Sequence, residues 1–301
     1  MKKVIVSILA ILIFLNTAIN IFAKNDTNYE AEYTSQTQNL DINAKSAILM
    51  EANTGKILYA MNETESASPA SVTKIMTLLI VMEAVDNQKI FLSDKVTVSA
   101  NAASMGGSQV FLEEGEVMSV EELIKCTTIA SANDAAVALA EFVCGSESLF
   151  VSKMNERAKE LGMEDTNFEN VTGLDDTTVN HVTSSKDIAI MSRELIKHEL
   201  ILKYSGLWQD TIRNGEFTLT NTNRLVRYYD GCTGLKTGST DKAGYCISTT
   251  AQRDGMVLIA VIMGAKTRDI RNAEVKKLLD YGFLFVEIFL LSIAICRERG
   301  V

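Results

Sequence analysis

The chain has 301 residues, of which 47% are hydrophobic, and it contains a single proline. This composition is ordinary for a globular protein, and the length allows one large domain or two smaller ones. The formal net charge of −9, from 38 acidic and 29 basic side chains, argues against a nucleic acid as partner. Recognition of an anion would depend on cations gathered at one place in the fold.

Residues 1–23 have the pattern of a secretory signal peptide. The first residues are positively charged, residues 4–15 are apolar, and Ala23 ends a stretch suited to cleavage. A retained N-terminal anchor is the alternative, although two asparagines interrupt the apolar run before it comfortably reaches a membrane-spanning length. We therefore expect an exported protein of the cell envelope, either secreted or membrane-associated.

The folded domain is expected to cover residues 45–283 and to begin with a β-hairpin. Residues 24–44, which precede it, are polar without apolar periodicity and predict a flexible linker. Two apolar runs, at 47–50 and 56–59, then flank the turn-forming residues 53–55, and this pattern is typical of two strands joined by a tight turn.

A helix is predicted to start around Ser71 and to run to about Glu83. Pro69 suits its first turn, because the missing N–H is not needed there. Ser71 and Lys74 are three residues apart, so both project from one helical face. A neutral lysine in that position could take the proton of the serine hydroxyl and make it nucleophilic. The S-x-x-K spacing alone is weak evidence, since it also occurs by chance.

The middle of the chain is predicted to be mainly helical. Ser119 followed by Glu122 forms a capping-box pattern, which starts a helix that ends near Ala130. A polar break at 131–133 separates this helix from the next one. The other elements expected in this part are a short strand within 91–98, helices at 134–143, 147–161 and 185–197, and a loop at 168–183.

From Trp208 onward the apolar period shortens, which indicates strands. They are expected at 217–219, 234–239, 245–250 and 256–263, and a helix is expected at 268–281. The order of strands, helices, strands and a last helix predicts an α/β (α+β) fold. One antiparallel sheet, built from both ends of the chain and flanked by helices, would carry an inserted helical subdomain.

The cysteines and histidines favour neither a disulfide scaffold nor a metal site. The five cysteines are dispersed without metal-ligand spacing, which indicates buried free thiols, although any single pair could be bonded. The two histidines form no H-E-x-x-H pattern, so a zinc hydrolase is not supported. A Ser-His-Asp triad would depend on His181 alone. We expect no metal and no cofactor.

Two further motifs belong with Ser71 and Lys74. Ser131-Ala132-Asn133 lies at the polar break between helices, and Lys236-Thr237-Gly238 lies in a predicted strand. In this order and at this wide spacing they match the S-x-x-K, S-x-N and K-T-G set of penicillin-interacting serine enzymes. The sequence is also similar to that of these enzymes at residues 51–59, 69–74, 131–135, 236–245 and 273–283.

On these motifs the chain resembles the serine-type D-alanyl-D-alanine carboxypeptidases of peptidase S11 type, the low-molecular-mass penicillin-binding proteins. The resemblance implies a fold similar to that of β-lactamases and transpeptidases. It also implies Ser71 as nucleophile and Lys74 as base, with Lys236 favouring the neutral form of that lysine. Ser131 would relay a proton to the departing amine, and Asn133 would bind the substrate amide and hold the lysine.

The predicted edge strand supplies the rest of the implied site. Lys236 and Thr237 would face the terminal carboxylate of the substrate, while Gly238 would let the substrate backbone lie close, because a Cβ there would point toward it. The backbone N–H groups of Ser71 and Ser239 would form the oxyanion hole.

Arg224 and Arg271 match arginines that line the family's site and bind a carboxylate. The implied substrate is a peptidoglycan stem pentapeptide ending in D-Ala-D-Ala, and β-lactam antibiotics are expected to acylate Ser71. Thr172 stands where the family often has histidine, which leaves the role of that position open.

Two other functions remain open from the sequence. A class A-like serine β-lactamase has a similar size and motif spacing, and Glu169 lies in a loop where those enzymes keep a deacylating glutamate. The middle motif is Ser-Ala-Asn rather than Ser-Asp-Asn, however, and the E-x-x-L-N context is absent. The other alternative is a catalytically idle penicillin-binding module, against which the intact motif set argues.

Residues 284–301 are expected to form a short apolar and charged tail outside the catalytic domain. The apolar part is too short to span a bilayer. It could be an interfacial helix that makes peripheral contact with a membrane, or the remnant of a truncated C-terminal domain. The resemblance stops abruptly after Phe283, which favours truncation.

Overall fold

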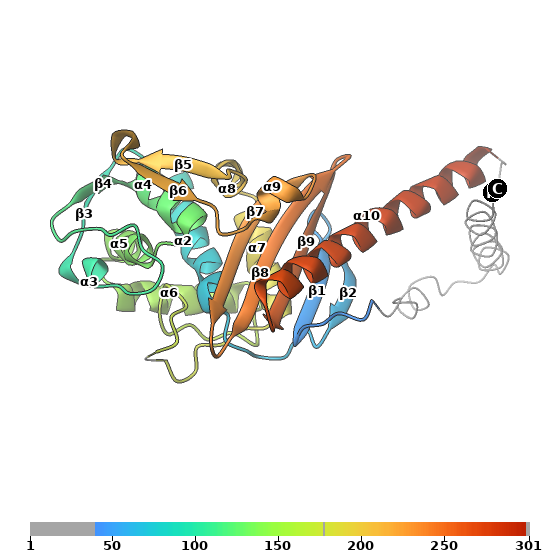
Figure 1. Ribbon diagram of the computed structural model, residues 1–301, viewed down its shortest axis with the longest axis horizontal. Coiled ribbons are helices and arrows are strands. Elements are labelled where there is room, and N and C mark those ends of the chain that lie inside the picture. The colour runs from blue at the N-terminus through green and yellow to red at the C-terminus, as the bar shows by residue number, and fades with distance from the viewer. Residues whose placement is uncertain (1–39, 177, 299–301) are drawn as a thin grey trace. The chain divides into compact units, whose positions relative to one another are not determined.

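A five-stranded antiparallel sheet brings the early and late strands together in the computed structural model (Figure 1), which describes residues 40–176 and 178–298. Its strand order is β2-β1-β9-β8-β7. The strands are β1 (Ser46–Glu51), β2 (Ile57–Met61), β7 (Cys232–Thr240), β8 (Gly244–Arg253) and β9 (Met256–Ala265). The predicted hairpin and the late strands therefore share one sheet, as expected.

Helices cover both faces of this sheet. On one face α7 (Ser185–Leu195) packs against β1 and β9, and α2 (Lys74–Asp86) packs against α7. On the other face α10 (Arg268–Glu298) crosses β8 and β9 (Figure 1). The nearly continuous apolar run in β9 follows from this arrangement, because both faces of this central strand are buried; the neighbouring β8 is also largely buried, although its middle contains serine and threonine.

The segment between β2 and β7 forms the predicted helical insertion. Ser119 caps α4 (Val120–Lys125), and the capping box with Glu122 is present. The insertion also contains α3 (Ala100–Ala103), α5 (Asn133–Cys144), α6 (Glu147–Glu160), α8 (Glu199–Ser205), α9 (Leu225–Tyr228) and two small two-stranded sheets, β3 (Lys95–Thr97) with β4 (Val117–Ser119) and β5 (Gln209–Ile212) with β6 (Phe217–Thr220). The α2 helix, which lies in the same segment, is buried on nearly all sides and packs against α5, α6 and α7.

Two helix boundaries differ from the expectation. The helix predicted to start at Ser71 begins instead as a 3₁₀ turn, η1 (Ala70–Thr73), before α2 starts at Lys74. The last helix continues to Glu298 and does not end at Tyr281, so the expected domain boundary after residue 283 falls inside it. Gly282 does not interrupt this helix; a Cβ there would lie 2.7 Å from a methyl group of Leu258, so the glycine allows the helix to approach the sheet closely.

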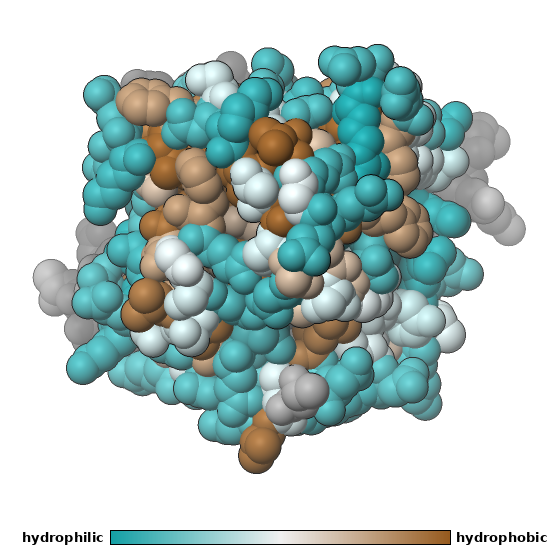
Figure 2. Space-filling view, turned by 90° about the vertical axis from the view of Figure 1, so that its left-hand side faces the viewer, coloured by the Kyte–Doolittle hydropathy of each residue, from teal (hydrophilic) through white to brown (hydrophobic). Residues whose placement is uncertain are grey.

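The predicted signal peptide, most of the predicted linker and the last three residues of the tail lie outside the described residues. Within the described part, no single helix is long and apolar enough to cross a bilayer; only α5 and α6 taken together, with a bend of 83° between them, reach that length and composition. On the face shown in Figure 2, apolar side chains form small groups among polar ones, as is common on protein surfaces.

The described cysteine side chains are free thiols, as the sequence indicates. They are Cys126, Cys144, Cys232 and Cys246. Burial raises the pKa of the Cys246 thiol to about 11, which keeps it protonated and unreactive near neutral pH.

Candidate active site

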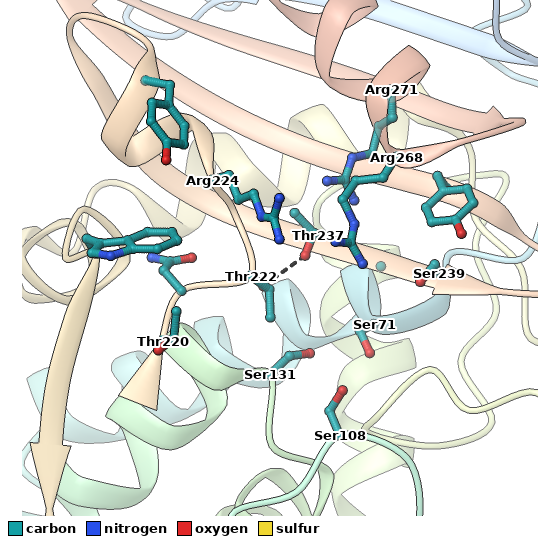
Figure 3. Close-up of a pocket in the computed structure, with 15 residues that line it drawn as sticks. Ser71, Ser108, Ser131, Thr220, Thr222, Arg224, Thr237, Ser239, Arg268 and Arg271 are labelled. Carbon is teal, nitrogen blue, oxygen red and sulfur yellow. Dashed lines mark hydrogen bonds between the residues drawn. The ribbon is translucent and has the colours of Figure 1, made fainter. Parts of the chain in front are cut away.

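The Ser71 hydroxyl lies in a cavity of about 650 Å³ between the helical insertion and β7 (Figure 3). The tight turn of η1 brings Lys74 Nζ to 3.0 Å from Ser71 Oγ. Ala70, directly before the serine, has a left-handed φ of +49°, which is strained for a residue with a Cβ. The backbone at the nucleophile is thus held by its surroundings rather than by its own preference.

Lys74 is fully buried and has three oxygen partners. Its Nζ lies 3.0 Å from Ser71 Oγ, 2.6 Å from Asn133 Oδ1 and 2.7 Å from the Thr172 carbonyl oxygen. The Asn133 Nδ2 group donates to the Gly106 carbonyl oxygen over 2.7 Å, so Oδ1 must face the lysine. Asn133 Oδ1 and the Thr172 carbonyl oxygen can only accept hydrogen bonds. A neutral Lys74 therefore donates to them and directs its lone pair at the Ser71 hydroxyl.

The environment also favours the neutral form of this lysine. Burial, followed by the charge of Lys236, lowers the pKa of Lys74 well below its ordinary 10.5. Lys236 is itself fully buried, and burial together with the charge of Arg271 lowers its pKa to about 7. Geometry and electrostatics agree that Lys74 can act as a base toward Ser71.

The third partner of Lys74 comes from the loop at 168–183. Asn170 Oδ1 accepts hydrogen bonds from the N–H groups of Thr172 and Gly173, and this turn holds the Thr172 carbonyl toward the lysine. Since Thr172 contributes its backbone, the contact with Lys74 does not depend on which side chain stands at this position. Sequence motifs do not reveal such a contact, because any residue can supply a carbonyl.

Ser131 and Asn133 reach the site through an irregular helix break. The π-helical turn η2 (Cys126–Ala130) ends at Ser131, which has a left-handed φ of +64°, and α5 begins at Asn133. Ser131 Oγ accepts a hydrogen bond of 2.8 Å from Lys236 Nζ. The three sequence motifs therefore form two lysine–serine pairs beside one cavity. A single π-helical turn such as η2 is frequent at functional sites.

Strand β7 lies along the other side of the cavity. Thr237, Gly238 and Ser239 line it, whereas Lys236 lies behind it, bonded to Ser131 and to the Thr237 carbonyl. The Nζ of Lys236 is thus held at Ser131, which lines the cavity, and the contact of Lys236 with a substrate carboxylate, expected from the resemblance, stays a prediction.

Gly238 is required for a different reason from the expected one. A Cβ there would lie 2.8 Å from the backbone nitrogen of Ser71 and 2.9 Å from the Pro69 carbonyl oxygen. The glycine therefore lets β7 pack against η1, and a side chain would push the strand away from the nucleophile. Ser71 and Ser239, the predicted oxyanion donors, both line the cavity.

Three arginines line the same cavity (Figure 3). Arg224 and Arg271 are the two expected from the sequence. Arg271 is buried and held by Asn272 Oδ1, and burial followed by the charge of Arg268 lowers its pKa to about 10. Arg268 was not among the residues expected from the sequence, although its position one helical turn before Arg271 places both on one face of α10.

His181 and Glu169 do not take part in the arrangement around Ser71. His181 Nδ1 accepts the Glu169 N–H, so Nε2 carries the proton and donates to Thr73 Oγ1 over 2.8 Å. Burial lowers the pKa of His181 to about 4 and keeps the ring neutral. The Glu169 carboxylate accepts the N–H groups of Val179 and Asn180 instead of facing the cavity. Neither a serine–histidine pair nor the deacylating glutamate of a β-lactamase is therefore formed.

Known proteins that are similar to this chain show its family. The peptidase S11 family model, described as D-alanyl-D-alanine carboxypeptidase, matches residues 32–267. The D-alanyl-D-alanine carboxypeptidase DacF of Bacillus subtilis is 49% identical over 286 residues, which cover 94% of this chain and 71% of that protein. The chain belongs to the D-alanyl-D-alanine carboxypeptidase family. It is an enzyme, a peptide hydrolase of the carboxypeptidase type, and the resemblance seen in its motifs is confirmed.

Solved structures confirm the transpeptidase-like fold of this carboxypeptidase. D-alanyl-D-alanine carboxypeptidase DacD from Francisella tularensis matches with a TM-score of 0.78 and 28% identity, over 88% of this chain and 74% of that one. Penicillin-binding protein D2 from Listeria monocytogenes, in its ampicillin-bound form, matches with a TM-score of 0.75 and 33% identity, over 81% of this chain and 99% of that one.

Replacing Lys236 with glutamine is expected to move the acid limb of the carboxypeptidase's acylation rate to higher pH. Acylation needs neutral Lys74, so the rate rises with pH through the pKa of that lysine and then levels off. The charge of Lys236 helps to hold this pKa down, and glutamine removes the charge while it can still donate to Ser131. The pH profile of adduct formation with penicillin measures the shift. If the acid limb of Lys236→Gln lies at the same pH as that of the exposed control Lys159→Gln, the predicted shift is contradicted.

Proposed function

We propose that this enzyme removes the terminal D-alanine from peptidoglycan stem peptides that end in D-Ala-D-Ala, through an acyl-enzyme on Ser71. The observation that carries this proposal is the Lys74 environment, in which two acceptor oxygens leave the lysine lone pair only the serine hydroxyl as partner. The family supplies the substrate class, and the cavity arginines supply groups for a free carboxylate.

Acylation begins when Ser71 Oγ attacks the carbonyl carbon of the penultimate D-alanine and its proton passes to Lys74. The oxyanion that forms would accept hydrogen bonds from the backbone N–H groups of Ser71 and Ser239. When the C–N bond breaks, Ser131 gives its proton to the departing amine, and Lys236 replaces that proton across their 2.8 Å hydrogen bond. A pKa of about 7 lets Lys236 release a proton and later take one back.

Deacylation reverses these proton transfers. Water attacks the ester carbon, and its proton passes through Ser131 to Lys236, while Lys74 returns its proton to Ser71 Oγ as the ester bond breaks. The net reaction is peptide plus water to shortened peptide plus D-alanine, and both lysines regain their starting protonation state. Arg224, Arg271 and Thr237 would bind the terminal carboxylate, which restricts cleavage to the C-terminal residue.

We further propose that penicillin acylates the same serine and that the protein acts outside the cytoplasm. The first is supported by penicillin-binding protein D2 from Listeria monocytogenes, which is similar to this chain and was solved in an ampicillin-bound and a cefotaxime-bound form. The second rests on the signal-like residues 1–23, and we place the catalytic domain at 45–283. Asn133 would bind the substrate amide after its side chain gives up one of its two present hydrogen bonds, to the Gly106 carbonyl or from Lys74.

The direct test measures free D-alanine after incubation of the purified protein with a peptide ending in D-Ala-D-Ala. We expect release by the wild-type protein and none above background for Ser71→Ala, and mass spectrometry should find one penicillin adduct per chain in the wild type only. A folded wild-type protein that releases no D-alanine would refute the activity. Penicillin turnover in well under a second, rather than a long-lived adduct, would instead support a β-lactamase.

A further inference from the structure

Arg268 is the third arginine of the cavity. Arg224 and Arg271 are enough to bind the one terminal carboxylate of the proposed substrate. Arg268 is exposed and lines the cavity with Arg224 and Arg271. Among the described residues its guanidinium has no hydrogen-bond or ion-pair partner, whereas Arg271 is bonded to Asn272 Oδ1. The group is therefore available to a ligand without first breaking an internal contact.

The charge balance of the cavity is unusual for this chain. The whole sequence has a net charge of −9, yet the described residues that line the cavity include three arginines and no aspartate or glutamate. The charge of Arg268 also disfavours the charged form of buried Arg271. Anionic groups of a ligand would relieve this repulsion, and three guanidinium groups can accommodate more than one such group.

We propose that Arg268 binds a second carboxylate of the substrate, on the acyl side of the bond that Ser71 attacks. This inference rests on the proposed function and names its substrate class: acyl donors that carry one anionic group beyond the terminal carboxylate. Such a group would strengthen binding of the acyl part that becomes attached to the serine.

The direction of the Arg268 side chain supports this assignment. In Figure 3 it extends from the start of α10 toward Ser71 and ends between Thr237 and Ser239, whereas Arg224 reaches Thr237 from the side away from Ser239. A peptide that adds to the free edge of β7 runs along these positions of the strand. Groups bound near Thr237 and near Ser239 would then lie on opposite sides of the reacting carbonyl.

Two matched pairs of acyl donors test the proposal. Carbenicillin has one carboxylate on its acyl side chain that benzylpenicillin lacks. N-acetyl-glutamyl-D-Ala-D-Ala has a side-chain carboxylate where N-acetyl-glutaminyl-D-Ala-D-Ala has a neutral carboxamide. For Arg268→Gln we expect a loss of about fivefold to tenfold in the second-order rate with the carboxylated member of each pair, a size typical of one charge-assisted contact at a partly exposed site. The neutral members should change less than about twofold, and Arg268→Lys should restore part of the loss.

The control is Lys266→Gln, which removes a positive charge from an exposed side chain outside the cavity lining. An equal loss with both members of a pair would assign Arg268 to the terminal carboxylate and overturn the proposal, as would no loss with either. If no peptide releases D-alanine but Ser71 still forms penicillin adducts, the proposed function fails while the penicillin pair still decides on Arg268. If wild-type protein reacts with none of the four compounds, both proposals fall.

Discussion

Replacing Lys74 with methionine is expected to slow acylation of Ser71 by about three orders of magnitude, the usual contribution of a positioned general base being about 10²–10⁴-fold. Methionine has a similar length and fits the buried site, but it cannot accept the serine proton. Both histidines and Glu169 are bonded elsewhere, so none of these three side chains is placed to substitute for Lys74. The rate of penicillin adduct formation, followed by mass spectrometry, gives the measurement.

A lysine on the exposed face of α6 provides the control for this variant. Lys159→Met changes the same atoms at a site remote from the cavity and should leave the rate unchanged. Thermal unfolding of both variants separates loss of the base from loss of the fold. A folded Lys74→Met protein that acylates within tenfold of the wild-type rate would show that another group activates Ser71.

Replacing Gly173 with alanine is expected to reduce both stability and acylation. Gly173 has a left-handed φ of +83°, and a Cβ there would overlap the carbonyl oxygen of Ala70, directly before the nucleophile. The conformation alone costs about 1–2 kcal/mol for a residue with a Cβ, and the forced displacement adds about 1–3 kcal/mol. Any shift that relieves the overlap moves either η1 or the Thr172 carbonyl that binds Lys74.

Gly145 offers a matched control, because it has the same φ of +83° but no atom within 4 Å of the added Cβ. Denaturant unfolding of Gly145→Ala should show the conformational cost alone, with a normal acylation rate. The difference between the two variants then isolates the contact at the nucleophile. Equal losses of stability, with acylation unaffected in both, would mean that the loop yields without disturbing Ser71.

Much of the site could be predicted because its chemistry is local in the sequence. Ser71 and Lys74 meet within one turn, and the break at 131–133 and the strand at 236–238 carry recognisable triplets. The sequence did not show that Lys236 bonds to Ser131 or that Gly238 lets β7 pack against η1, because both contacts depend on how distant segments come together. Nor does a sequence pattern identify a backbone carbonyl such as that of Thr172 as a partner of the lysine.

The sequence by itself determined the strands of the central sheet, most of the longer helices, the family motifs and the pairing of Ser71 with Lys74, because apolar periodicity and close spacing act over a few residues. Only the tertiary structure decided that burial lowers the pKa of Lys74 and that two acceptor oxygens lie beside its Nζ in addition to the serine hydroxyl. Those properties come from burial and from partners 59 and 98 residues away in the chain. Arg268 likewise became part of the site only when the start of α10 was placed at the cavity that Ser71 and β7 line, since desolvation and charge act through space and not along the sequence.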